Sequence, residues 1–149
     1  MMILLDTNVL IHAYSEASIF RERAASILLS ALTGDTEAVV APQNLYEFYS
    51  VATNPKRVKP PLSCEEAAEI CRTIHESPEL VKIHPSENTP ITALSLAEEQ
   101  RLDGARIFDC VLAATAKENG VEIIYTQNVE DFRGFGFLKV IDPFDDATD

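Results

Sequence analysis

The sequence predicts an α/β protein of three layers, in which a mainly parallel five-stranded sheet lies between helices. Five short apolar runs rich in β-branched residues alternate with segments of helical periodicity, an order typical of parallel sheets with right-handed crossovers. The runs are nearly continuous rather than alternating, which indicates strands buried on both faces. A length of 149 residues suits one compact domain, which we expect to span residues 1–149.

Each predicted strand stops at, or close to, a polar residue or a proline. Asp6 directly follows the first strand, and Thr126 directly follows the fourth. The predicted strands are residues 3–5, 38–41, 80–83, 121–125 and 138–141.

Helical patterns fill the gaps between these strands, with apolar residues at three- and four-residue spacing. Ser63 followed three residues later by Glu66 predicts a capping box, and Gly34 and Gly120 stand where helices are expected to end. The predicted element order is β-α-α-β-α-α-β-α-α-β-α-β. The clearest helical segments are residues 20–32, 43–53, 89–102 and 107–119, with a further helix opening at Ser63.

Composition limits the function classes. The N-terminus lacks the basic flank and long apolar stretch of a signal peptide, and no apolar run approaches the roughly 20 residues of a membrane span. We therefore expect a soluble cytoplasmic protein without membrane contact. The three cysteines form no CxxC pair, which argues against a disulfide framework or a zinc site.

The net charge of −12 is unusual for a protein that binds nucleic acid, because phosphate attracts basic surfaces. Bound metal ions and a local cluster of cations are two ways to reconcile the charge with such a function. The excess of acid also suits a basic protein partner.

Four acidic residues lie beside predicted strand ends or helix starts: Asp6, Glu47, Asp109 and Asp131. Sites in open α/β sheets form beyond the carboxyl ends of the strands, so we expect all four at one edge. Two unit charges about 4 Å apart repel by about 4 kcal/mol at a typical effective dielectric. An oxygen-seeking ion such as Mg²⁺ or Mn²⁺ relieves this repulsion, and a pair of such ions supports phosphodiester chemistry.

Two polar residues are expected to support this cluster. Thr126 can hydrogen-bond a metal-binding acid, and Asn8 can orient Asp6 or cap the first helix. His12 lies close to Asp6 in sequence, but we do not assign it as a general base, because metal-activated water needs no histidine.

The motifs around these acids resemble those of PIN domains, with order and spacing intact over essentially the whole chain. The matching segments are residues 2–10, 44–55, 107–116 and 125–132. The resemblance implies a PIN-like α/β/α sandwich and metal-dependent RNA cleavage, and it is closest to VapC-type toxins of toxin–antitoxin pairs. It carries Asp6, Glu47 and Asp109 over as metal-binding acids and Asp131 as a more variable fourth acid.

The resemblance also implies a homodimer and a small basic or amphipathic antitoxin that blocks the site. Asn128 stands where some members of the family carry an acid. This departure puts in doubt whether the chain holds a second metal ion as those members do.

The expected contacts to RNA come from the few cations. Lys56, Arg57 and Lys59 form the only basic run, directly after the segment that carries Glu47. Arg106 lies three residues before Asp109, where it can approach a substrate phosphate or pair with a carboxylate.

Three other functions compete with that of a toxin. A phosphatase of the haloacid-dehalogenase type also begins with a strand ending in Asp, but it needs a second Asp at the position of Asn8. A PIN nuclease of RNA processing would act without an antitoxin. A non-catalytic PIN-like module would bind RNA or protein and would not need a metal ion.

Overall fold

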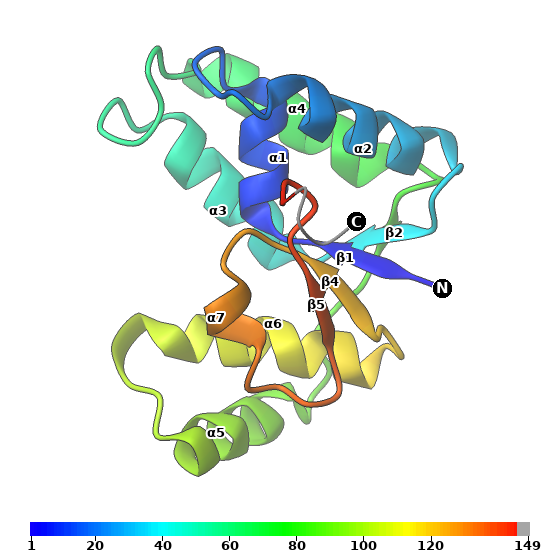
Figure 1. Ribbon diagram of the computed structural model, residues 1–149, viewed down its shortest axis with the longest axis vertical. Helices are drawn as coiled ribbons and strands as arrows, with labels where there is room; N and C mark the ends of the chain where they lie inside the picture. Colours follow the sequence, from blue (N-terminus) through cyan, green and yellow to red (C-terminus); the bar gives the residue numbers. More distant parts are fainter. Residues whose placement is uncertain (146–149) are drawn as a thin grey trace.

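The computed structural model describes residues 1–145, and these residues contain a five-stranded parallel sheet (Figure 1). The strand order is β3-β2-β1-β4-β5, and every neighbouring pair is parallel. The strands are β1 (Ile3–Leu5), β2 (Ala38–Val40), β3 (Val81–Lys82), β4 (Ile123–Tyr125) and β5 (Lys139–Ile141). The predicted α/β fold is confirmed, and the sheet of the described residues is entirely rather than mainly parallel.

Helices cover both faces of the sheet, so that α1 to α4 lie above it in Figure 1 and α5 and α6 lie below it. The helices are α1 (Thr7–Tyr14), α2 (Arg21–Thr33), α3 (Pro42–Ala52), α4 (Cys64–Glu76), α5 (Thr89–Gln100), α6 (Ile107–Glu118) and α7 (Val129–Phe132). A 3₁₀ turn at Gly104–Arg106 leads into α6. The observed order of strands and helices is the predicted one.

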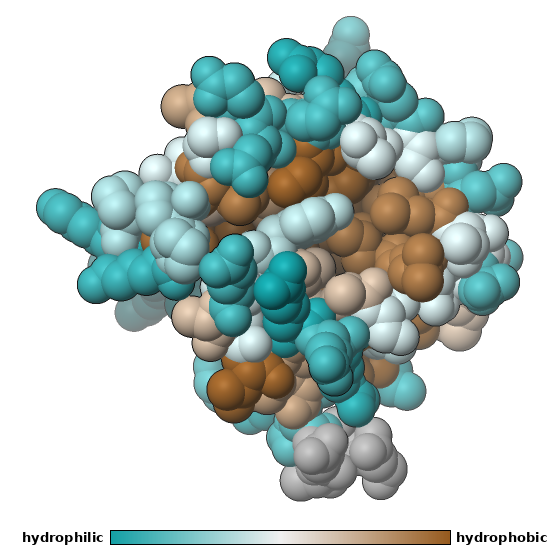
Figure 2. All heavy atoms as spheres, turned by 90° about the horizontal axis from the view of Figure 1, so that it is seen from above, coloured by the Kyte–Doolittle hydropathy of each residue, from teal (hydrophilic) through white to brown (hydrophobic). Residues whose placement is uncertain are grey.

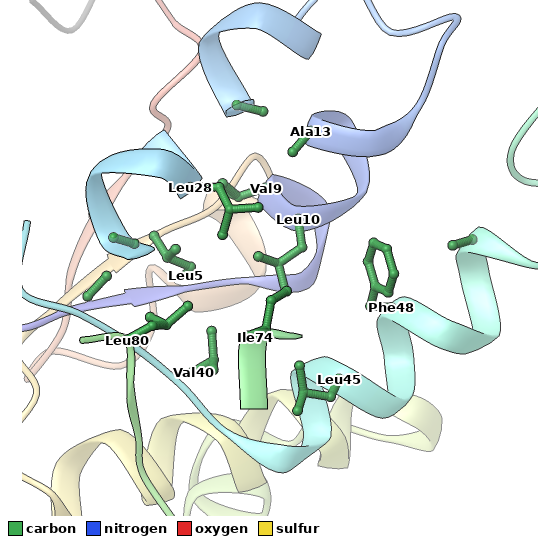
Figure 3. Packing of buried hydrophobic residues seen from close by; sticks show 14 of the residues in the cluster. Leu5, Val9, Leu10, Ala13, Leu28, Val40, Leu45, Phe48, Ile74 and Leu80 are labelled. Carbon is green, nitrogen blue, oxygen red and sulfur yellow. The ribbon is translucent and has the colours of Figure 1, made fainter. Parts of the chain in front are cut away.

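Two hydrophobic clusters, one on each face, hold the layers together. In β2, Val40 belongs to the cluster under α1 to α4, whereas Val39 belongs to the cluster against α5 and α6. Successive side chains of a strand point to opposite faces, so a continuous apolar run serves both clusters. Figure 3 shows the first cluster, which contains Leu5 and Val40 of the strands and Leu10 and Phe48 of the helices.

The prediction that all five strands are buried on both faces is wrong for the two outer strands. Val81 of β3 is 47% exposed, and Lys139 at the start of β5 is also exposed. Both strands lie at an edge of the sheet, where one side of the strand has no neighbour. Central β2, by contrast, is buried at all three of its residues.

The predicted helix caps at Ser63 and Gly34 are confirmed. The Ser63 hydroxyl accepts a hydrogen bond from the amide of Glu66 at 3.0 Å, and the Glu66 carboxylate accepts one from the amide of Ser63 at 3.1 Å. Gly34 ends α2 with a positive φ of 83°, a conformation that glycine adopts without the strain a side chain would cause.

Within residues 1–145, no helix combines the length and the hydrophobicity needed to cross a bilayer. The three cysteines, Cys64, Cys71 and Cys110, are free thiols. Figure 2 shows the surface over the upper helical layer, where hydrophobic patches lie among hydrophilic side chains.

Candidate active site

The strand order reverses between β1 and β4, and the two key polar residues lie at this point. Leu5 pairs with Tyr125, so the residues that follow, Asp6 and Thr126, leave the sheet side by side. The Thr126 hydroxyl donates a hydrogen bond to Oδ2 of Asp6 at 2.7 Å, and both residues are buried. Crevices at such reversal points are the usual binding sites of open parallel sheets.

Asp6 also caps the helix that begins after it. Its backbone is extended, and its Oδ1 accepts a hydrogen bond from the amide of Thr7 at 2.8 Å. The side-chain amide of Asn8 donates to Oδ2 of Asp6 at 3.3 Å and to the Thr126 hydroxyl at 3.1 Å. The carboxylate is therefore held in one orientation from two elements, which confirms the predicted contacts of Asn8 and Thr126.

The environment raises the pKa of Asp6 from its usual 3.8 to about 6. Burial is the main cause, because removal from water disfavours the charged form. Hydrogen bonds from Thr126 and Thr7 oppose the rise, and the negative charges of Glu47 and Asp109 add to it. These effects show that the three acids lie near enough to interact.

Glu47 reaches the same place from α3, which begins at Pro42 directly after β2. Its Oε2 accepts a hydrogen bond from the Thr7 hydroxyl at 3.1 Å, and its Oε1 accepts one from Gln43 at 2.6 Å. The Gln43 amide also donates to the carbonyl of Phe108 at 3.0 Å, which ties α3 to the start of α6. Neutral donors therefore fix both oxygens of Glu47.

Asp109 lies in the first turn of α6 and is paired with a cation. Nε of Arg106 donates to its Oδ2 at 2.8 Å. Partial burial nevertheless raises the pKa of Asp109, with the Arg106 hydrogen bond opposing the rise and the charge of Asp131 adding to it. Arg106 also reaches Asp131, donating to its carbonyl at 2.9 Å and lying 3.9 Å from its Oδ1.

Three of the four predicted acids border one pocket of about 360 Å³, hereafter the acidic pocket. The pocket is lined by Asp6, Thr7, Asn8, Ile11, His12, Glu47, Val51, Arg57, Asp109, Gln127 and Asn128. The side chain of Asp131 does not line it and is 41% exposed. The structure thus brings three acids together and leaves the fourth at the rim.

The donor chemistry of the acidic pocket fits a hard divalent cation, because carboxylate and amide oxygens are the ligands that Mg²⁺ and Mn²⁺ prefer. As they stand, however, no three acidic, histidine or cysteine side chains of residues 1–145 are grouped closely enough to hold an ion. The carboxylates are instead engaged by Thr7, Thr126, Gln43 and Arg106. The metal-binding role of the acids stays a prediction.

The four cations predicted to bind RNA have different surroundings. Arg57 lines the acidic pocket, whereas Lys56 and Lys59 lie on a neighbouring pocket that Arg57 also lines. Arg106 is engaged by Asp109 and Asp131, which is the carboxylate pairing considered for it from the sequence.

Three residues of the site were missed by the sequence analysis. Thr7 links Asp6 to Glu47, and Gln43 holds Glu47 from one helical turn away, a spacing that could have signalled the contact. Gln127 lines the acidic pocket and lies 2.5 Å from Nε2 of His12. No local pattern indicates this last contact, since 115 positions separate the two residues.

Comparison with known proteins agrees with this architecture. The family model described as "PIN domain" matches residues 3–138. Ribonuclease VapC24 of Mycobacterium tuberculosis is 33% identical over 144 residues, which cover 95% of this chain and 97% of that protein.

Two solved structures show the same fold at lower sequence identity. The VapC20 toxin of Mycobacterium tuberculosis superposes with a TM-score of 0.67 at 12% identity, covering 89% of this chain and 95% of that one. A toxin–antitoxin complex from Klebsiella pneumoniae contains a chain with a TM-score of 0.63 at 21% identity, covering 96% and 98%. With its motifs, strand order and acidic pocket, the chain belongs to the PIN-domain family, among the VapC ribonucleases.

Proposed function

We propose that the protein is a metal-dependent endoribonuclease that cleaves RNA phosphodiester bonds in the acidic pocket and acts as the toxin of a toxin–antitoxin pair. The observation that carries the proposal is that Asp6, Glu47 and Asp109, from three distant parts of the chain, border one pocket. The names of the relatives support the reaction, since they are described as ribonucleases.

Asp6, Glu47 and Asp109 are the residues that would hold Mg²⁺ or Mn²⁺, with Asp131 contributing from the rim. Such an ion, when bound, supplies Lewis acidity toward a phosphodiester and toward water. Thr7, Thr126 and Gln43 hold the carboxylates of Asp6 and Glu47 at the pocket by hydrogen bonds before any ligand arrives. This preorganisation lowers the cost of gathering like charges at the moment of reaction.

Asn128 extends the oxygen-donor set without adding charge. Its backbone amide donates to the Thr126 hydroxyl at 3.0 Å, so the residue is tied to the group that orients Asp6. Because an amide replaces the carboxylate that some family members carry here, we propose one firmly held ion, with a second held only together with substrate.

The proposed partners are RNA, a second copy of the chain and a small basic antitoxin. One solved structure with this fold is a toxin–antitoxin complex from Klebsiella pneumoniae, and the net charge of −12 favours a basic partner. A largely apolar pocket of about 690 Å³, lined by exposed Tyr46 and Phe108, adjoins Glu47 and Asp109. A partner seated there would cover the approach to the acids.

The experiment that tests the reaction is RNA cleavage by the purified protein in EDTA, Mg²⁺ or Mn²⁺. We expect cutting only with a divalent ion. An Asp6→Asn variant should not cut. An Asp142→Asn variant, which changes an acid outside the acidic pocket, is its control and should cut like the wild type. Cleavage that persists in EDTA, or that is absent with every metal and RNA class in a folded protein free of inhibitor, would refute the proposal.

A further inference from the structure

A second pocket of about 310 Å³ opens beside the acidic pocket, between the loop after α1 and the loop after α3. Ile11, His12 and Arg57 line both pockets, so the two spaces share a wall. The two loops lie side by side at the upper left of Figure 1. An extended ligand that enters the acidic pocket can therefore continue into the second pocket.

The second pocket carries the opposite charge. Its lining includes Lys56, Arg57 and Lys59 and no acidic side chain, while Glu16 of the adjoining loop lies outside it. These are three of the 12 lysines and arginines in the whole chain. Within the described part of the chain, none of the three is in an ion pair. Their charge is therefore available to an anionic ligand.

The loop that presents these cations is anchored rather than merely exposed. Val58, between the cations, is only 4% exposed and inserts into the protein. The carbonyl of Asn54 accepts hydrogen bonds from the amides of Arg57 and Val58 at 2.9 and 3.0 Å, and its side chain accepts one from the amide of Lys56 at 2.9 Å. A fixed loop loses less conformational entropy when a ligand binds.

The opposite wall supplies neutral polar groups. Ser15 and Ser18 line the second pocket, and hydroxyls of this kind are common contacts of nucleic-acid phosphates. Nδ1 of His12 lies 2.6 Å from the Ser18 hydroxyl, and its Nε2 lies 2.5 Å from Oε1 of Gln127 in the acidic pocket. His12 is thus a positioning residue between the two pockets.

We infer that the second pocket binds a single phosphate of the RNA backbone, next to the bond that is cut in the acidic pocket. The inference rests on the proposed ribonuclease function and adds a substrate subsite to it. The acidic pocket repels phosphate unless cations are bound there, so a strand on this acidic protein needs an anchor of its own. The paired pockets separate the two tasks of holding the backbone and cutting it.

The test measures binding of a fluorescent 12-nucleotide single-stranded RNA in EDTA, where no metal-dependent cleavage interferes, over a range of salt concentrations. The variant is Lys56→Gln with Lys59→Gln; Arg57 is left in place because it also lines the acidic pocket. We expect affinity to fall about tenfold at low salt and the slope of log K against log salt to flatten by about 0.7 in total, the change for the loss of one phosphate contact on a single strand.

The matched control replaces two exposed cations outside both pockets, Arg101→Gln with Lys139→Gln, and should leave affinity and slope within twofold of the wild type. An equal loss in both double variants would overturn the inference, because it would show a diffuse charge effect. Equal competition by a polyglutamate peptide of matched charge would overturn it in favour of an acidic peptide. Unchanged binding by the Lys56 and Lys59 variant would also overturn it.

The failure of the subsite is distinguishable from the failure of the proposed function. If the wild type cuts RNA with Mg²⁺ but the double lysine variant binds normally, the subsite is wrong and the nuclease function stands. A selective loss of binding in a protein that cuts no RNA would instead leave an RNA-binding module. On an RNA that is cut once, replacing single phosphates by neutral methylphosphonates should weaken wild-type binding at one position beside the cut and leave the variant unaffected there.

Discussion

Asp6 and Asp131 occupy opposite ends of the same acidic cluster, and their surroundings differ in almost every respect. Asp6 is 6% exposed and receives hydrogen bonds from a backbone amide and a buried hydroxyl. The side chain of Asp131 is 41% exposed, lies outside the pocket lining and has the cation Arg106 3.9 Å from its carboxylate. The carboxylate of Asp6, the inner acid, is held in one orientation by the fold, whereas the more exposed carboxylate of Asp131, the outer acid, is free to change its orientation.

The largest expected effect is the difference in cleavage rate between variants of the two acids. With Mg²⁺, Asp6→Asn should lower the cleavage rate by roughly 10³-fold, since several kcal/mol of transition-state stabilisation are lost. Asp131→Asn should lower it by about tenfold or less, because water can replace an exposed ligand. Single-turnover cleavage of one RNA substrate measures the rate of each variant. Equal losses of rate would contradict the view that Asp6 contributes more to the reaction than Asp131.

The second prediction concerns pH and stability in the absence of metal. Since the pKa of Asp6 is about 6 in the folded protein against a usual 3.8, the folded state holds the proton more tightly. The free energy of unfolding should therefore fall as pH rises from about 4 to about 6, by about 3 kcal/mol from this group alone.

Denaturant unfolding in EDTA at pH 4, 5, 6 and 7, comparing the wild type with Asp6→Asn, isolates this contribution. The variant should be the more stable protein at pH 7, and its advantage should shrink toward pH 4. An Asp6→Asn protein that gains nothing at pH 7 would contradict the prediction.

The third prediction tests the hydroxyl that holds the inner acid. Thr126→Val removes the donor to Asp6 and the acceptor of the Asn128 backbone amide, and it leaves the Asn8 side-chain amide with Asp6 as its remaining acceptor. We expect a loss of about 1–3 kcal/mol in unfolding free energy at pH 7. Thr115→Val is the matched control: this threonine is equally buried but bonds only the Val111 carbonyl within α6, so its loss should stay below about 1 kcal/mol.

The smallest expected effect concerns Arg106, which joins Asp109 to the outer acid. Arg106→Gln removes a positive charge 2.8 Å from Asp109 and should tighten Mn²⁺ binding about three- to tenfold in calorimetry. Arg133→Gln, which affects only an exposed pair with Glu130, should leave Mn²⁺ affinity unchanged. Weaker binding by Arg106→Gln would mean that the arginine positions Asp109 for the ion instead of competing with it.

Local sequence was sufficient for the elements and for most of the site. Continuous apolar runs identified the strands, and capping residues such as Ser63 located helix ends, because both depend on neighbours in the chain. The position of Asp6 directly after the first predicted strand likewise predicted a site residue, because sites form at the carboxyl edge of a parallel sheet.

The amino-acid sequence by itself therefore determined the α/β class and the order of the elements, and it indicated four candidate acids. Only the tertiary structure decided that three of them line the acidic pocket while Asp131 stays at the rim, that Arg106 is engaged by carboxylates, and that His12 meets Gln127. The reason is physical: periodicity and capping are local, whereas burial, ion pairing and shared pocket walls depend on how distant strands and helices are brought together.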